Sequence, residues 1–85
     1  MKEVSLYFKE GNSDKEYHIQ LEKSGEGFVV NFQYGRVGSN LSAGSKTDSP
    51  VTLAEAEKIF AKLEKEKRGK GYNDGEKKVL FRDNL

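Results

Sequence analysis

A strand that ends in a glycine-flanked arginine is indicated by Phe28-Val29-Val30-Asn31-Phe32-Gln33-Tyr34-Gly35-Arg36-Val37-Gly38. Large apolar residues alternate with smaller or polar ones from Phe28 to Gln33, which is the two-residue period of a strand with one face on a core. Tyr34 shares the apolar side and reaches the rim of the sheet. Gly35 and Gly38 allow a sharp turn or the close approach of a ligand. A planar ring and a guanidinium at such a strand end suit stacking on a nucleic acid end and neutralising its charge, so the stretch predicts a binding site.

Two further strands precede this stretch. Residues 4–8 and residues 17–21 alternate apolar and polar side chains, as strands with one buried face do. Turn-forming residues separate them at 11–14, and a second turn cluster follows at 24–27. His18 is predicted to lie on the solvent face, opposite to Ile19. The pattern therefore predicts consecutive antiparallel strands joined by tight turns.

A capping box predicts a helix that begins soon after Pro50. The Thr52 hydroxyl can accept a hydrogen bond from the Glu55 amide, and the Glu55 carboxylate can accept one from the Thr52 amide. Gly69 and Gly71 indicate the end of the helix, and basic residues in its last turns complement the negative end of the helix dipole. An apolar stripe at helical spacing predicts the face that packs on the sheet. Its members are Leu53, Ala56, Ile59, Phe60 and Leu63.

The expected fold class is α+β, with an antiparallel sheet of four to five strands and one α-helix packed on one face. Residues 39–49 are polar and contain glycine, so they are compatible with a short fourth strand or with a loop. Val79-Leu80-Phe81 is predicted to dock back onto the sheet as a last strand. We expect a single domain over residues 1–85, since a chain of this length buries only about 60% of its unfolded surface in one small core.

Composition excludes several kinds of site. The chain has no cysteine and one histidine, so disulfides, thiolate metal ligands and histidine clusters are not expected. The sequence contains no phosphate-loop or nucleophile motif, and therefore predicts no enzyme activity, no metal and no cofactor. No apolar run approaches the roughly 18 residues of a membrane span, and the first residues lack a signal-peptide pattern. We therefore expect a cytoplasmic protein that does not associate with membranes.

Charge is nearly balanced overall but unevenly distributed. The formal net charge of +1 gives no global attraction to a polyanion, so nucleic-acid binding would depend on local asymmetry. Basic residues outnumber acidic ones between Lys62 and Lys70, which makes Lys67, Arg68 and Lys70 candidates for anion contacts. The alternative is that these side chains only solubilise the end of the helix.

The ordered motifs of the chain resemble those of the WGR domain family, which is named for a Trp-Gly-Arg motif. Residues 34–38, Tyr-Gly-Arg-Val-Gly, stand where that family has W-G-R-[VI]-G. Residues 15–21 resemble its K-x-Y-x-[IL]-x-[IL] strand, residues 54–60 resemble its helix core, and residues 67–72 resemble the K-x-x-x-G-[YW] that closes the helix. The resemblance covers nearly the whole chain. Its one departure is at the first letter, where Tyr34 replaces tryptophan.

The resemblance implies a nucleic-acid-binding module. WGR domains occur in poly(ADP-ribose) polymerases and in bacterial proteins, some of them freestanding. In the polymerases they help to bind DNA at strand breaks, with the motif aromatic against a sugar near a 5′ end and the arginine partly at domain contacts. Carried onto this chain, the resemblance and the charge pattern imply a site that prefers DNA ends or nicks. Its residues are Tyr34, Gly35, Arg36, Lys67, Arg68 and Lys70.

Several alternatives remain open from the residues alone. Tyr34 can belong to the core instead of a ligand surface, and Tyr72 is expected to pack structurally at the end of the helix. Arg36 can be an ordinary ion-pair partner of a nearby carboxylate. The near-neutral net charge also leaves a protein–protein interaction module that uses the Arg36 face as the second functional hypothesis.

Overall fold

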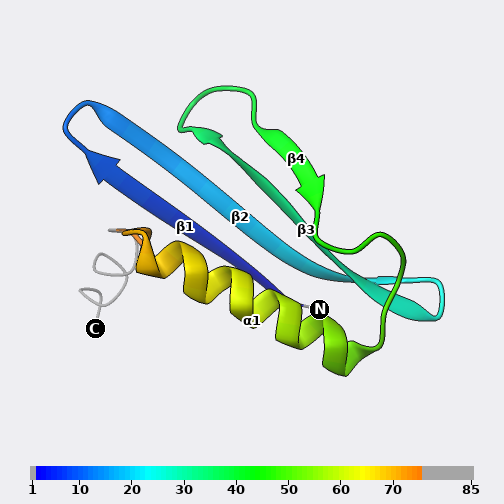
Figure 1. Cartoon of the computed structure of the whole chain (residues 1–85). Helices are drawn as coiled ribbons and strands as arrows, with labels where there is room; N and C mark the ends of the chain where they lie inside the picture. The colour runs from blue at the N-terminus through cyan, green and yellow to red at the C-terminus, as the bar shows by residue number, and fades with distance from the viewer. Residues whose placement is uncertain (1, 76–85) are drawn as a thin grey trace, which may run out of the picture.

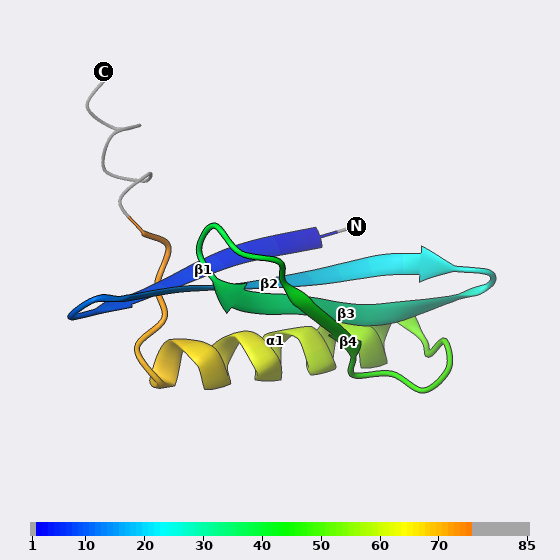
Figure 2. The ribbon, with the colours of Figure 1, turned by 90° about the horizontal axis from the view of Figure 1, so that it is seen from above.

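The computed structural model describes residues 2–75 and shows a four-stranded antiparallel sheet with one helix on one face (Figures 1 and 2). The strands lie side by side in chain order as a meander. Their bounds, followed by those of the helix, are β1 (Lys2–Glu10), β2 (Ser13–Ser24), β3 (Gly27–Arg36), β4 (Ser42–Ser45) and α1 (Leu53–Gly69). The predicted fold class is confirmed. The strand predicted at residues 79–81 lies outside the described residues.

The core lies between α1 and the sheet, and it uses the side chains that the alternating pattern predicted. The fully or nearly fully buried residues are Leu6, Tyr17, Ile19, Leu21, Val30, Ala56, Phe60 and Leu63. Leu53, which the helical stripe included, is instead 46% exposed. The reason is the course of the chain before α1, because the backbone of Val51 pairs with Phe28 on β3 and the Val51 side chain packs against the core at this end.

Both ends of α1 are fixed locally. The Thr52 hydroxyl accepts a hydrogen bond from the Glu55 amide at 3.1 Å, which is the first half of the predicted capping box. At the other end, the Lys70 amide donates to the Lys67 carbonyl at 3.0 Å. The helix ends at Gly69, as its sequence predicted. The segment that the sequence left as a strand or a loop contains the short β4, which pairs with residues 31–34 of β3.

The chain crosses the free edge of β1 after the helix. Tyr7 and Asn73 exchange two backbone hydrogen bonds of 2.7 and 2.8 Å, so within residues 2–75 this edge is paired at one residue. Tyr72 packs on Phe8, with ring centroids 5.4 Å apart, and also belongs to the residues around the core. The structural role expected of Tyr72 is confirmed. These contacts hold the C-terminal end of α1 over the ends of β1 and β2.

The face of the sheet away from α1 is polar. His18 lies on it, as predicted, but its side chain is only 16% exposed and not freely solvated. One ring nitrogen is 2.8 Å from the Ser5 hydroxyl and the other is 2.8 Å from the Glu16 carboxylate. No helix within residues 2–75 is long and apolar enough to span a membrane.

Candidate nucleic-acid interface

Tyr34 is presented on a platform of other aromatic rings. It is the register partner of Tyr17, and the two rings stack with centroids 5.7 Å apart and planes inclined by 19°. Phe32 stacks on Tyr17 at the same centroid distance. Tyr17 is 6% exposed, whereas Tyr34 is 44% exposed. The alternative that Tyr34 is a core residue is therefore wrong, because part of its ring contacts a core residue while much of it faces solvent.

Tyr17 is held in place from the helix side. The Lys67 ammonium lies 4.6 Å from the centroid of the Tyr17 ring, within the range of a cation–π contact. Tyr72 meets the same ring edge-on at 6.0 Å. Burial raises the pKa of the Tyr17 hydroxyl above its ordinary value, and the negative charge of Glu66 adds to this shift. Tyr17 is therefore a neutral, rigid support for Tyr34 at neutral pH.

Arg36 ends β3 at a tight turn. The Val37 amide donates to the Asp14 carbonyl at 2.8 Å, and the Ser39 amide donates to the Arg36 carbonyl at 3.1 Å. Gly38 has a φ of 90°, a conformation that a residue with a side chain rarely adopts. The turn leaves Arg36 exposed and without an ion pair to any residue within 2–75. The ion-pair alternative for Arg36 is thus unsupported.

Gly35 lies close to the loop between β3 and β4. A Cβ atom at this position would lie 3.1 Å from a methyl carbon of Leu41, in the loop between β3 and β4. A side chain at this position would require the Leu41 side chain to shift by a few tenths of an ångström. A role of Gly35 in binding stays a prediction.

The basic residues at the end of α1 differ in their surroundings. Lys67 lies over the Tyr17 ring and so joins the Tyr34 platform. Arg68 is held by two carboxylates, with its Nε 2.9 Å from Glu64 and one terminal nitrogen 3.0 Å from Asp74. Hydrogen bonds to Asp74 and then Glu64 raise the pKa of the Arg68 guanidinium. Lys70 is exposed in the turn that follows the helix.

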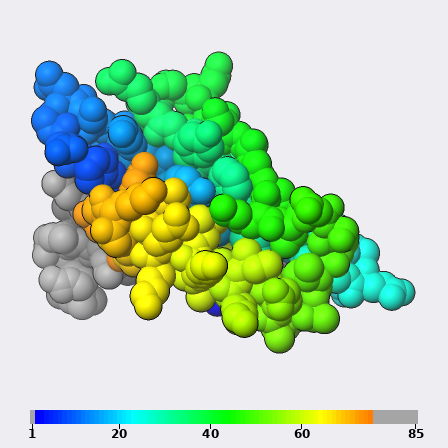
Figure 3. Space-filling model, in the orientation of Figure 1, coloured from blue at the N-terminus to red at the C-terminus, as the bar shows by residue number. Residues whose placement is uncertain are grey.

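The helix leaves this end of the sheet open. In the space-filling view, surface that belongs to β2 and β3 shows between the C-terminal end of α1 and the loop between β3 and β4 (Figure 3). Tyr34 and Arg36 belong to the last residues of β3, and Lys67 contacts Tyr17, the ring on which Tyr34 stacks. Arg68, paired to carboxylates, is not brought to the Tyr34 ring by any contact in the described part of the chain.

Sequence reasoning missed two contributors to this surface. Tyr17 was assigned to a strand but not to the support of Tyr34, and Lys15 was not singled out. Lys15 is the register partner of Arg36 on the helix-bearing face of the sheet. The signal for both lies in the pairing of β2 with β3, since residues 15 and 17 share one side of a strand. The register itself was needed to place them beside residues 36 and 34.

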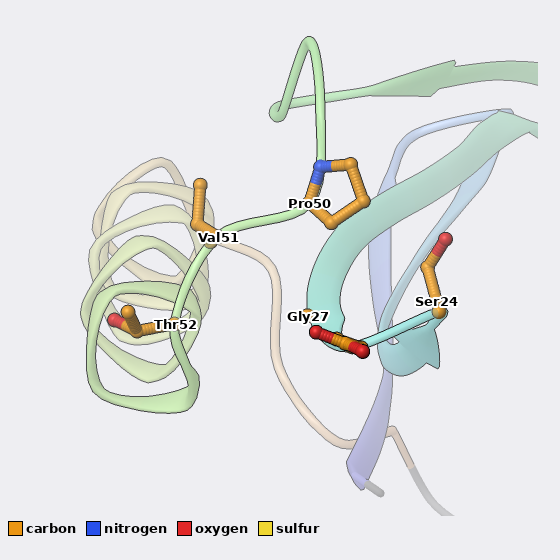
Figure 4. A pocket seen from close by; sticks show the side chains of 7 residues that line it. Ser24, Gly27, Pro50, Val51 and Thr52 are labelled. Carbon is orange, nitrogen blue, oxygen red and sulfur yellow. The ribbon is translucent and has the colours of Figure 1, made fainter.

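A shallow hollow lies at the other end of the sheet. It is formed by the turn between β2 and β3 and by the segment that leads into α1, and Pro50 and Gly27, which both line it, lie close together (Figure 4). The predicted site residues do not line it. Within residues 2–75, no group of three or more histidine, cysteine, aspartate or glutamate side chains could hold a metal ion.

The fold and the exposed aromatic and basic surface together define a small α+β binding domain. A family model described as the WGR domain matches residues 3–79. The chain therefore belongs to the WGR domain family, whose members are in general nucleic-acid-binding modules. Searches among curated proteins and among solved structures found no match.

Proposed function

We propose that this domain binds DNA at ends or nicks, with Tyr34 and Arg36 at the centre of the contact and the basic end of α1 at its margin. The observation that supports the proposal is that Tyr34 is both exposed and held in place. Its ring is 44% exposed, yet it is stacked on the buried Tyr17 ring. An exposed aromatic side chain that is already ordered loses little conformational freedom when a flat group stacks on it.

The preference for ends follows from what a strand break exposes. Inside a continuous duplex, the flat faces of the bases are covered by their neighbours, whereas an end or a nick makes a terminal base or sugar accessible. Stacking on an aromatic side chain contributes about 1–3 kcal/mol per base in single-strand binders. Tyr34 offers less area than the tryptophan of the family motif, so we expect moderate affinity.

The cations supply the sequence-independent part of the affinity. Arg36 presents a planar fork of donors that matches phosphate geometry, and it has no competing carboxylate within residues 2–75. Lys67 and Lys70 add positive charge near the opening. Because the net charge of the chain is only +1, this attraction is local, and we expect binding to weaken steeply with added salt.

The proposed role is binding without catalysis. The Ser5, His18 and Glu16 side chains form a hydrogen-bonded chain, but they lie on the face of the sheet away from Tyr34. These residues sit in the β1–β2 ladder, which occupies backbone groups that an oxyanion site would need. In the proposal, this chain of side chains holds β1 to β2.

A titration of labelled duplexes tests the proposed function. Three duplexes of one sequence are compared over a salt series: one continuous, one nicked with a 5′ phosphate and one nicked without it. We expect the nicked duplexes to bind more tightly than the continuous one. The slope of log affinity against log salt then estimates the number of phosphates contacted. Equal affinity for nicked and continuous duplexes, or no binding at low salt, would contradict the proposal.

A second candidate is a protein-interaction module that uses the Arg36 face. The observation that favours it is the exposed side chain of Val37, which is 46% accessible and directly follows Arg36. An apolar side chain beside an unpaired arginine resembles the centre of many protein interfaces. If Arg36→Ala leaves the set of proteins that co-purify with the domain from its native host unchanged, this candidate loses its support.

A further inference from the structure

Two cations stand directly opposite each other at the end of the β2–β3 ladder. Lys15 and Arg36 are register partners, and they project from the face of the sheet that carries Tyr34. Opposed side chains on antiparallel strands have Cβ atoms about 4.5–5.5 Å apart, and like charges in this arrangement are destabilising. The register therefore places two like charges on neighbouring strands beside the proposed binding surface.

The two positive charges of this pair are not neutralised in the described part of the chain. Neither Lys15 nor Arg36 forms an ion pair with any residue within 2–75. Asp14, next to Lys15 in sequence, projects to the opposite face, where its register partner is Lys9. The Lys15 ammonium lies 5.8 Å from the centroid of the Phe8 ring, on β1, and so leans toward the side of β2 away from Arg36. It is not neutralised there, and turning toward Arg36 would bring both charges onto one anion. Two opposed cations without a carboxylate are the arrangement that an anion would stabilise.

We propose that Lys15 and Arg36 together bind one phosphate group beside the Tyr34 ring. The proposal rests on the nucleic-acid-binding function proposed above and adds Lys15 as a binding residue. Arg36 follows Tyr34 by two residues, a rise of about 6.6 Å along the strand, so a group stacked on Tyr34 and a phosphate on the pair lie within the span of one nucleotide. The phosphate can come from a backbone phosphodiester or from a terminal monoester.

Charge-removing variants on nicked DNA test the shared site. Lys15→Gln and Arg36→Gln are compared with the double variant in titrations over a salt series. The matched control is Lys23→Gln, which removes the same charge from the same strand and the same face, opposite Phe28 at the far end. Each single variant should weaken binding roughly two- to fivefold, the size typical of an exposed ion pair. Each single variant should also reduce the slope of log affinity against log salt by about 0.9 or less, because one phosphate contact contributes about 0.9 to this slope.

The double variant distinguishes one shared phosphate from two separate ones. A shared phosphate predicts that the double variant loses about 0.9 from the salt slope in total, whereas two independent contacts predict about 1.8. The larger loss would overturn the shared site. Equal affinities for Lys15→Gln and Lys23→Gln would overturn the role of Lys15. Loss of the Lys15 effect on removal of the 5′ phosphate from the nick would identify a terminal monoester, and its persistence would identify a backbone phosphodiester.

A measurement without DNA separates this inference from the proposed function. Thermal unfolding is followed in inorganic phosphate and in chloride at matched ionic strength. Phosphate should raise the Tm of the unmodified domain and of Lys23→Gln more than that of Lys15→Gln or Arg36→Gln, because a ligand that binds the folded state stabilises it. If DNA binds but Lys15→Gln matches Lys23→Gln in both assays, only the phosphate site is wrong. If DNA does not bind but the phosphate effect depends on Lys15, only the DNA function is wrong.

Discussion

Tyr34 rests on Tyr17 across the β2–β3 ladder, with ring centroids 5.7 Å apart and planes inclined by 19°. The exposed ring is thereby coupled to the core, since Tyr17 is buried and contacts Lys67 of α1 and Tyr72 beyond the helix. Sheet, helix and the segment after the helix all contribute to holding one side chain. This coupling explains how a small domain can present an ordered aromatic ring to solvent.

Substitutions of Tyr34 should change affinity in opposite directions. Tyr34→Ala should weaken binding to nicked DNA by about 1–3 kcal/mol, because the stacking surface is lost. Tyr34→Trp should strengthen binding, because an indole offers a larger stacking area. Leu53→Ala is the control, as Leu53 is similarly exposed but lies at the other end of the molecule. The measurement is a titration by fluorescence anisotropy of labelled DNA.

The Tyr34→Trp variant also reports directly on stacking. The chain contains no tryptophan, so the introduced indole would be its sole tryptophan fluorophore. We expect its emission to be quenched when nicked DNA is added. Unchanged emission together with undiminished binding by Tyr34→Ala would show that DNA does not contact this ring.

Arg36 and Arg68 should respond differently to removal of charge. Arg36→Gln should weaken DNA binding while leaving the free energy of unfolding nearly unchanged, because Arg36 forms no ion pair within residues 2–75. Arg68→Gln should lower the free energy of unfolding by about 0.5–1 kcal/mol, since it breaks exposed ion pairs with Glu64 and Asp74. Urea unfolding and DNA titration of both variants check this. A loss of stability in Arg36→Gln together with a loss of DNA binding in Arg68→Gln would contradict this prediction.

Alkaline pH should destabilise the domain partly through Tyr17. The pKa of the Tyr17 hydroxyl is raised above its ordinary value of 10.0 in the folded state, first by burial. Above pH 10 the unfolded chain loses this proton while the folded chain keeps it, so stability falls with rising pH until the folded group also ionises. Tyr17→Phe removes this contribution. Its free energy of unfolding should therefore decline less between neutral pH and the alkaline range, and a parallel decline would argue against the shift.

The polar contact on the opposite face should matter for stability but not for binding. Ser5→Ala removes the hydroxyl that is 2.8 Å from His18 Nδ1, so we expect a loss of about 1 kcal/mol in the free energy of unfolding. The control is Ser24→Ala, at the far end of β2 on the same face of the sheet as His18. Affinity for nicked DNA should be unaffected in both variants. A large loss of affinity in Ser5→Ala alone would show that DNA binds to the face that carries His18, which would contradict the proposed surface.

Local sequence patterns predicted most of the fold because each element carries its own signal. The period-two alternation identified the buried sides of β1, β2 and β3, and the Thr52 cap identified the start of α1. Leu53 was misjudged because helical spacing alone does not show where the sheet ends. Its place near the core is taken by Val51, whose pairing with Phe28 depends on the tertiary path of the chain.

The candidate site was only partly predictable for the same reason. The Tyr34–Arg36 motif is contiguous and could be recognised directly, whereas Lys15 and Tyr17 approach it through the β2–β3 register. The basic residues at the end of α1 look equivalent in the sequence, but their side-chain contacts differ. Lys67 turns toward Tyr17, while Arg68 is occupied by carboxylates. Which of the predicted residues bind nucleic acid stays a prediction.

The most direct test is to follow the backbone amide resonances of the isotope-labelled domain by NMR while nicked duplex DNA is added. The account predicts shifts concentrated at the end of the β2–β3 ladder, around residues 15–17 and 34–38, with smaller shifts at residues 67–70. The amides of residues 24–27, 51 and 52, around the hollow at the other end, should remain unchanged. Shifts confined to that hollow or to the face that carries His18, or no shifts at all, would contradict the claim that Tyr34 and Arg36 form a DNA-binding surface.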